Sequence, residues 1–238
     1  MKKLITICLV AAVVLVLAES PASAALYGTV NATVGGGPGL TMASMIHPYD
    51  TSWYTGFTGQ FQLTYSNMNP PTMGLLPDAF CIETQTISIG GTYPYSVRDA
   101  FDAPIPGGPN DTSGGPMGTQ KADYLAELWG QFHSQVNSNI TAAAFQLAVW
   151  EIVFEDLYVQ TPPGWNVLSG KFEARDDAGN PHSAIVQANA WLAQVDGSGP
   201  KAQLYGLTNS SAQDFLVPEP ATVALLGLGA LSLIRRKK

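Results

Sequence analysis

The sequence predicts an α+β fold in which a β-sandwich or barrel carries an inserted helical subdomain. Segments with the alternation or β-branched content of strands occupy the first 90 residues and return near residue 200. Segments with helical periodicity lie between them, after a loop at 103–118 that is rich in glycine and proline. Strands grouped on either side of a run of helices are typical of the α+β class.

The strand predictions rest on side-chain alternation and composition. In 53–66, Phe57, Phe61, Leu63 and Tyr65 alternate with polar residues, as in a half-buried strand. The segment 79–89 is rich in β-branched residues and has Cys81 near its start. Strands are therefore predicted at 26–34, 53–66 and 79–89, and shorter ones at 165–168, 202–207 and 213–217.

Three helices are predicted, at 119–133, 141–157 and 183–195. The second has Thr141 or Asn139 as its candidate N-cap. A helical projection at about 100° per residue gives it a solvent-facing side, made of Ala144, Ala148, Glu151 and Glu155.

Gln146 lies on the opposite side of that helix. It shares an apolar stripe with Trp150, Val153 and Leu157. An unpaired amide in a protein interior costs a few kcal/mol. We therefore expect Gln146 to be hydrogen-bonded or used chemically.

Both ends of the chain have the features of targeting segments. Residues 1–24 combine two lysines, an apolar run and a small-residue pattern that predicts cleavage between Ala24 and Ala25. Near the other end, Pro218, Glu219 and Pro220 precede a fourteen-residue segment, 221–234, in which only Thr222 and Ser232 are polar. Four basic residues follow: Arg235, Arg236, Lys237 and Lys238. The segment is short for a stable membrane span of about 20 residues, which favours a sorting signal over the alternative of a permanent tail anchor.

This tail resembles the PEP-CTERM sorting signal of diderm bacteria, which an exosortase processes. The resemblance covers about the last twenty residues and includes the Pro-Glu-Pro triplet, the short apolar segment and the arginine-rich end, in that order. It implies delivery to the cell surface or extracellular matrix, often together with exopolysaccharide and biofilm, with transient membrane anchoring at the C-terminus. The predicted organisation is a signal peptide at 1–24, a secreted domain at 25–216 and a sorting signal at 217–238.

The secreted part of the chain is acidic. Residues 25–220 contain five Lys and Arg against 17 Asp and Glu, a net charge of −12, whereas the whole chain has −7. Such a surface argues against nucleic acid and anionic lipid as partners. Membrane contact is predicted only through the C-terminal segment.

The number and positions of the cysteines restrict which reactions the secreted domain can carry out. Cys8 lies in the signal peptide, so Cys81 is the only thiol of the secreted domain and no internal disulfide can form. A single cysteine in an exported protein indicates intermolecular pairing, a reactive thiol or a buried inert residue. A thiolate that attacks a glutamine carboxamide and displaces ammonia forms an internal thioester.

Two segments resemble the thioester domains of Gram-positive surface adhesins. Phe80-Cys81-Ile82 matches their aromatic-Cys-aliphatic motif. The segment from Phe145 to Trp150, FQLAVW, matches their glutamine motif, with Phe145 in place of the usual threonine. The resemblance implies that Cys81 and Gln146 form the thioester, in a pocket made by Phe80, Ile82, Trp150 and Val153. It also implies covalent capture of surface amines on a target, without catalytic turnover and without a cofactor.

The residues also allow two other interpretations. One is a noncovalent structural or carbohydrate-binding matrix protein with a free cysteine, whose aromatics stack on sugar rings: Trp53, Tyr54, Tyr93, Tyr95 and Trp165. Another is a cysteine hydrolase, which requires His47, His133 or His182 beside Cys81. The scattered histidines lack metal-ligand spacing, and the acidic turn 176–180 falls short of a calcium loop.

Overall fold

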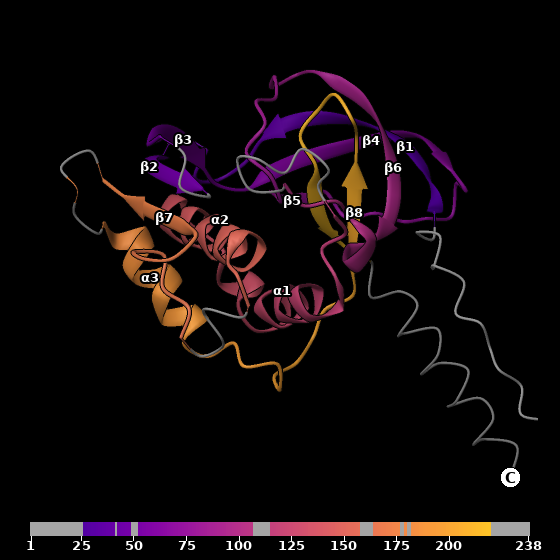
Figure 1. Ribbon diagram of the computed structural model, residues 1–238. Coiled ribbons are helices and arrows are strands. Elements are labelled where there is room, and N and C mark those ends of the chain that lie inside the picture. The colour runs from indigo at the N-terminus through magenta and orange to yellow at the C-terminus, as the bar shows by residue number, and fades with distance from the viewer. Residues whose placement is uncertain are drawn as a thin grey trace, which may run out of the picture.

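The computed structural model describes residues 26–40, 42–48, 52–106, 115–157, 164–176, 179 and 182–219. The expected signal peptide with its cleavage site at Ala24 and Ala25 lies outside the described residues. So do Pro220, the apolar segment 221–234, Arg235 and Arg236. The described part is a β-rich α+β fold (Figure 1).

Nine strands and three α-helices are found in the described part of the chain. The strands are β1 (Leu26–Gly36), β2 (Met42–Pro48), β3 (Tyr54–Thr58), β4 (Phe61–Asn69), β5 (Asp78–Cys81), β6 (Thr92–Asp99), β7 (Phe172–Arg175), β8 (Leu204–Thr208) and β9 (Phe215–Pro218). The helices are α1 (Thr119–Phe132), α2 (Asn139–Phe154) and α3 (Ser183–Leu192), with 3₁₀ turns η1 (Ala100–Asp102) and η2 (His133–Gln135).

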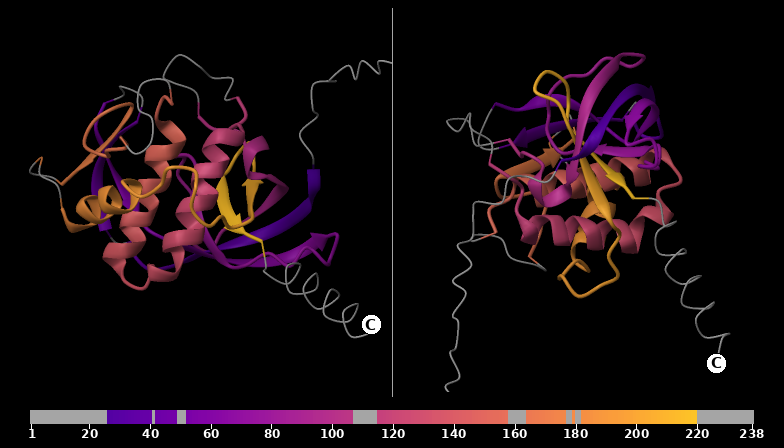
Figure 2. Two further views of the ribbon diagram at one scale, coloured as in Figure 1. Left: turned by 90° about the horizontal axis from the view of Figure 1, so that it is seen from below. Right: turned by 90° about the vertical axis from the view of Figure 1, so that its right-hand side faces the viewer.

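Six strands form a closed antiparallel barrel in the order β1-β4-β5-β9-β8-β6. Strands β3, β2 and β7 form a separate three-stranded sheet. The helices lie along one side of the barrel, with the small sheet next to them, and the two views of Figure 2 agree on this arrangement. Closure removes the exposed edges that an open sheet would leave.

Helix α2 lies in the middle of this arrangement. It packs against α1, α3 and strands β2, β3, β5 and β7, and every residue from Ala142 to Phe154 is buried. A helix that is covered on all sides has no solvent face. The predicted solvent-facing side was therefore wrong: Ala144, Ala148, Glu151 and Glu155 are at most 1% exposed.

Helix α1 and the start of α3 follow the predictions within one residue, whereas α2 and α3 both end three residues earlier than expected. Helix α2 begins two residues earlier than expected, because Ser138 is its N-cap. Ser138 Oγ accepts a hydrogen bond from the Thr141 N–H, and Thr141 Oγ1 accepts one from the Ser138 N–H. This reciprocal capping box replaces the expected Thr141 or Asn139 cap.

Two of the predicted strands are interrupted. The segment 53–66 divides into β3 and β4 at Gly59, where the chain at 38–40 passes so close that a Cβ on Gly59 would lie 2.4 Å from Leu40 N. The segment 79–89 is a strand only as far as Cys81, because side chains take over the hydrogen bonding there. The predicted strand at 165–168 is a loop, while β2, β6 and β7 were not predicted.

Buried carboxylates join the helices to loops. Glu127 of α1 accepts hydrogen bonds from the Gly197 and Gly199 N–H groups, at 2.5 and 2.8 Å. Glu151 accepts one from Asn166 N–H, and Glu155 accepts one from Lys171 N–H. These loops lack strand partners for their N–H groups, so the carboxylates supply the acceptors.

We predict that Glu127→Ala lowers the free energy of unfolding by about 1–3 kcal/mol, because it leaves the N–H groups of Gly197 and Gly199 without their acceptor. Chemical denaturation measures the change. Asp123→Ala is the matched control on the same helix, since Asp123 makes an exposed ion pair with Lys201 and is expected to cost less than about 1 kcal/mol. Equal losses in the two variants would contradict the prediction.

Candidate functional site

The fold brings Cys81 and Gln146 side by side. Cys81 is the last residue of β5, and Gln146 lies on the turn of α2 that faces it. The Cys81 N–H donates to Gln146 Oε1 at 2.9 Å, and Gln146 Nε2 donates to the Cys81 carbonyl oxygen at 2.9 Å. The carboxamide of Gln146 therefore both accepts a hydrogen bond from the backbone of Cys81 and donates one to it.

The same helix also holds the residues that follow Cys81. Trp150 Nε1 donates to the Glu83 carbonyl oxygen at 3.2 Å, and Gln213 Nε2 donates to the same oxygen at 3.0 Å. The Ile82 N–H donates to the Asp214 carbonyl oxygen. Side chains of α2, together with the Gln213 side chain and the Asp214 carbonyl of the segment before β9, thus take the place of a neighbouring strand, which explains why β5 ends at Cys81.

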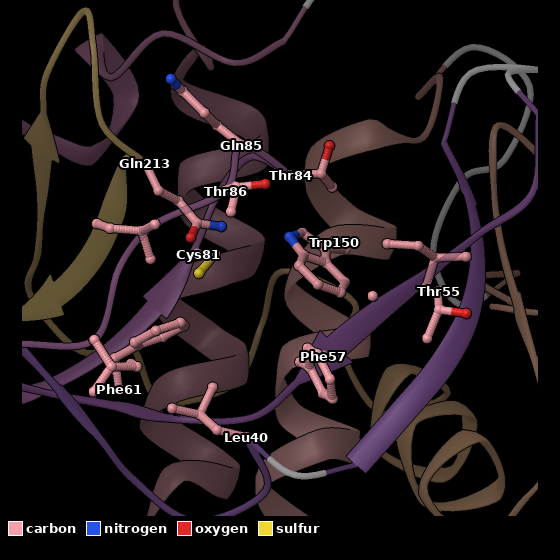
Figure 3. Close-up of a pocket in the computed structure, with 14 residues that line it drawn as sticks. Leu40, Thr55, Phe57, Phe61, Cys81, Thr84, Gln85, Thr86, Trp150 and Gln213 are labelled. Carbon is pink, nitrogen blue, oxygen red and sulfur yellow. The ribbon is translucent and has the colours of Figure 1, made fainter.

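Cys81 lies at a cavity of about 280 Å³. Figure 3 shows its sulfur among the side chains that line this cavity, with Gln213 above it and Trp150 to its right. The cavity is lined by Leu40, Ile46, Thr55, Gly56, Phe57, Phe61, Cys81, Thr84, Gln85, Thr86, Ile87, Ile89, Trp150 and Gln213. None of these side chains carries a formal charge, so the space beside the sulfur is apolar, with hydroxyl and amide groups on part of its wall.

The residues expected to form a thioester pocket occupy two different places. Trp150 lines the cavity, whereas Phe80, Ile82 and Val153 are buried and are not among its lining residues. Phe80 instead packs against Phe145, with 4.5 Å between the ring centroids. Position 145 thus faces an aromatic core, which suits the phenylalanine found there in place of threonine.

Several lining residues were not anticipated from the sequence. Thr84, Gln85 and Thr86 follow Cys81 closely, so their nearness in the chain was a usable signal. Gln213 and Phe57 gave no such signal, because their place beside Cys81 depends on the pairing of β5 with β9 and on the position of β3.

Burial dominates the electrostatics of the site. It raises the pKa of the Cys81 thiol well above its usual range, and nearby Glu83 raises it further. Burial also raises the pKa of Glu83, while a hydrogen bond from the Asp214 N–H lowers it. The thiol is therefore protonated at neutral pH.

No histidine lines the cavity or hydrogen-bonds to Cys81 in the described part of the chain. His47 stacks on Trp53, and His182 Nδ1 accepts from the Ala184 N–H at the start of α3. His133 stacks on Trp129, and its pKa is lowered by burial, with Asp78 opposing the shift. A cysteine–histidine pair, as the hydrolase interpretation requires, is not among these contacts.

The aromatics considered for sugar stacking differ in exposure. Tyr95 and Trp165 are core residues, at 2% and 4% exposed, so they present no ring face to a sugar. Trp53 stacks on His47 on one side and contacts the Arg175 guanidinium, 3.7 Å from its ring centroid. Tyr93 is partly buried against the core, and the side chain of Tyr54 lies outside the described residues.

Within the described residues, no group of three or more His, Cys, Asp or Glu side chains is arranged to hold a metal ion. The turn at 176–180 lies partly outside them. The helices of the described part are too short or too polar to cross a membrane.

Comparison with known protein families identifies a motif in the C-terminal tail of the chain. The PEP-CTERM protein-sorting motif matches residues 216–238. This match supports export, surface association, an exosortase as the sorting partner and C-terminal membrane anchoring before sorting. No curated protein and no solved structure matches the chain.

Asp214, next to the site, gives a prediction for stability. Burial raises its pKa from 3.8 to about 8; the Asn209 N–H and Arg98 oppose this shift and Glu83 adds to it. Asp214 therefore keeps its proton in the folded state at pH values where the unfolded chain has lost it. Its contribution to the free energy of unfolding is complete below about pH 4 and is lost as the pH rises to about 8. Asp214→Asn keeps an oxygen acceptor for the Asn209 N–H but cannot ionise.

We therefore expect the free energy of unfolding to fall less steeply between about pH 4 and pH 8 in Asp214→Asn than in the wild type. Denaturant unfolding across that range measures it. Asp123→Asn, an exposed carboxylate on α1, serves as control and is expected to follow the wild type. A wild-type slope in Asp214→Asn would show that Asp214 does not titrate in this range.

Proposed function

We propose that this protein is an exported surface adhesion protein that attaches covalently to amines of a partner through a thioester between Cys81 and Gln146. The observation that carries the proposal is the pair of 2.9 Å hydrogen bonds between the Gln146 carboxamide and the backbone of Cys81. Their effect is to hold the acyl group beside the residue that bears the only thiol of the secreted domain.

The hydrogen bonds also suit the chemistry of bond formation. When the sulfur attacks Cδ of Gln146, negative charge develops on Oε1, which already accepts from the Cys81 N–H. A fixed donor at that oxygen stabilises the tetrahedral intermediate. The C–N bond then breaks, and ammonia leaves with the thiol proton, so the step needs no further reactant.

The surroundings favour survival of the thioester. Cys81 and Gln146 are 2% and 1% exposed, and the cavity wall has no charged side chain. Exclusion of water protects a reactive acyl group from hydrolysis. A primary amine that attacks this carbonyl would form an amide with Gln146 and release the Cys81 thiol, without regenerating the thioester.

A second function is favoured by the same contact. Two hydrogen bonds satisfy the Gln146 carboxamide without any reaction, as expected for a buried polar group. In this alternative the protein is a noncovalent structural or carbohydrate-binding matrix component, possessing a buried free thiol. Exopolysaccharide would be its partner, recognised through residues other than the buried Tyr95 and Trp165.

Intact mass spectrometry of the exported domain distinguishes the two. With a thioester, we expect the wild type to be lighter than its calculated mass by one ammonia. Incubation with methylamine should then add one methylamine. Neither change should occur in Cys81→Ala or Gln146→Ala, while Gln213→Ala, which keeps both reacting groups, should behave as the wild type.

A full calculated mass for freshly prepared wild-type protein, unchanged by methylamine, would reject covalent attachment. Circular dichroism of all variants is the accompanying control, because a misfolded variant would lose the mass change for a trivial reason. The noncovalent function would then be the one to pursue.

A further inference from the structure

The sorting motif begins within the barrel. Pro218 is the last residue of β9 and pairs with Leu204 of β8. The Glu219 N–H donates to the Gln203 carbonyl oxygen at 2.9 Å, and the Tyr205 hydroxyl donates to Glu219 Oε1 at 3.0 Å. The first two residues of the Pro-Glu-Pro triplet are thus part of the folded domain.

This placement leaves little chain between the barrel and the membrane. Only Glu219 and Pro220 separate Pro218 from Ala221, where the apolar segment of the sorting signal starts. Three Cα–Cα steps of about 3.8 Å span at most about 11 Å. In the membrane-anchored precursor, the end of the barrel from which β9 leaves therefore lies at the bilayer surface.

That end of the barrel exposes apolar and aromatic side chains. Leu26 is 56% exposed, Tyr27 is 45% exposed and Phe101 is 37% exposed. The Tyr27 ring lies 5.0 Å from the ring of Tyr205, the residue that holds Glu219. We call Leu26, Tyr27, Phe101 and Tyr205 the barrel-end surface.

Backbone pairing places these four residues at one end of the barrel. Leu26 pairs with Arg98 of β6, and Asp99 of β6 pairs with Tyr205 of β8. Phe101 follows directly in η1, which packs against β8. The surface is therefore continuous around the point where β9 ends.

The acidic residues of this end, Asp99, Asp102 and Glu219, outnumber its basic residue Arg98, so the end suits a zwitterionic rather than an anionic lipid interface. The Tyr27 hydroxyl donates to both oxygens of Asp99, at 3.1 and 3.0 Å, and the Tyr205 hydroxyl donates to Glu219. Arg98 is the basic residue here, and its Nε donates to Thr208 Oγ1. Tyrosines with an apolar ring and a hydroxyl bound to polar groups are typical of the boundary between lipid and water.

We propose that, in the sorting precursor, the barrel-end surface rests on the lipid headgroup region of the bilayer that holds the sorting segment. The sequence predicted membrane contact only through the C-terminal segment, whereas this contact also involves the folded barrel. It also keeps Cys81 away from the bilayer surface. Cys81 pairs with Phe215, three residues before Pro218, so the cavity lies about 10 Å further from the membrane along β9. The proposal does not depend on the thioester.

The test uses the exported precursor, residues 25–238, in vesicles of phosphatidylcholine and phosphatidylethanolamine. In a Cys81→Ala background, Phe101→Cys is labelled with an environment-sensitive fluorophore, and the vesicles contain lipid with a quencher near the headgroup. Val186→Cys on α3 is the matched control, because Val186 is 60% exposed and belongs to the helical side of the molecule. We expect several-fold stronger quenching at position 101 than at position 186.

Leu26→Cys supplies a second position on the barrel-end surface and should be quenched like Phe101→Cys. Flotation with the vesicles confirms that the tail is inserted, and circular dichroism confirms folding. With both controls met, equal or absent quenching at positions 26, 101 and 186 would overturn the proposal. Quenching that appears only when exosortase is added to the vesicles would also overturn it, since the surface would then dock on the enzyme.

Discussion

The paired hydrogen bonds between the Gln146 carboxamide and the Cys81 backbone are the contact on which the arrangement of this domain depends. They join the end of a barrel strand to the most buried helix of the fold. Because the amide offers a donor and an acceptor at once, it replaces a strand partner at the point where β5 ends. The cavity beside Cys81 exists because the chain leaves the barrel there instead of continuing as a strand.

The same principle operates elsewhere with carboxyl groups. Glu83, Glu127, Glu151 and Glu155 each accept hydrogen bonds from backbone N–H groups of loops. This solution has an electrostatic cost: burial raises the pKa of Glu151 well above its usual range, and nearby Glu155 raises it further. This electrostatic cost is offset because loop N–H groups left unpaired in the interior would also destabilise the folded state.

The predictions succeeded where local periodicity determines structure and failed where a distant segment does. Three helices were confirmed, because apolar residues at helical spacing over ten or more positions are a local signal, although the face of α2 that this spacing assigned to solvent is buried. The strand predicted at 79–89 ended at Cys81, because Gln146 and Trp150, far along the chain, take its backbone hydrogen bonds. Glu151 and Glu155 were assigned to solvent because a sequence does not reveal which loops will need acceptors. Strand β2 was missed because 42–48 shows no clear alternation and is stabilised by pairing with β3 and β7.

By itself, the sequence determined the C-terminal sorting motif, the three helices and the two residues, Cys81 and Gln146, that the proposed chemistry requires. These features depend on residue type and short spacing, which are visible without a fold. The tertiary structure alone decided that Gln146 is bound to the backbone of Cys81, that Gln213 and Phe57 share the cavity, and that Glu219 is held by Tyr205. Each of these contacts joins residues that strand pairing or helix packing brings together, and no local sequence pattern encodes such a contact.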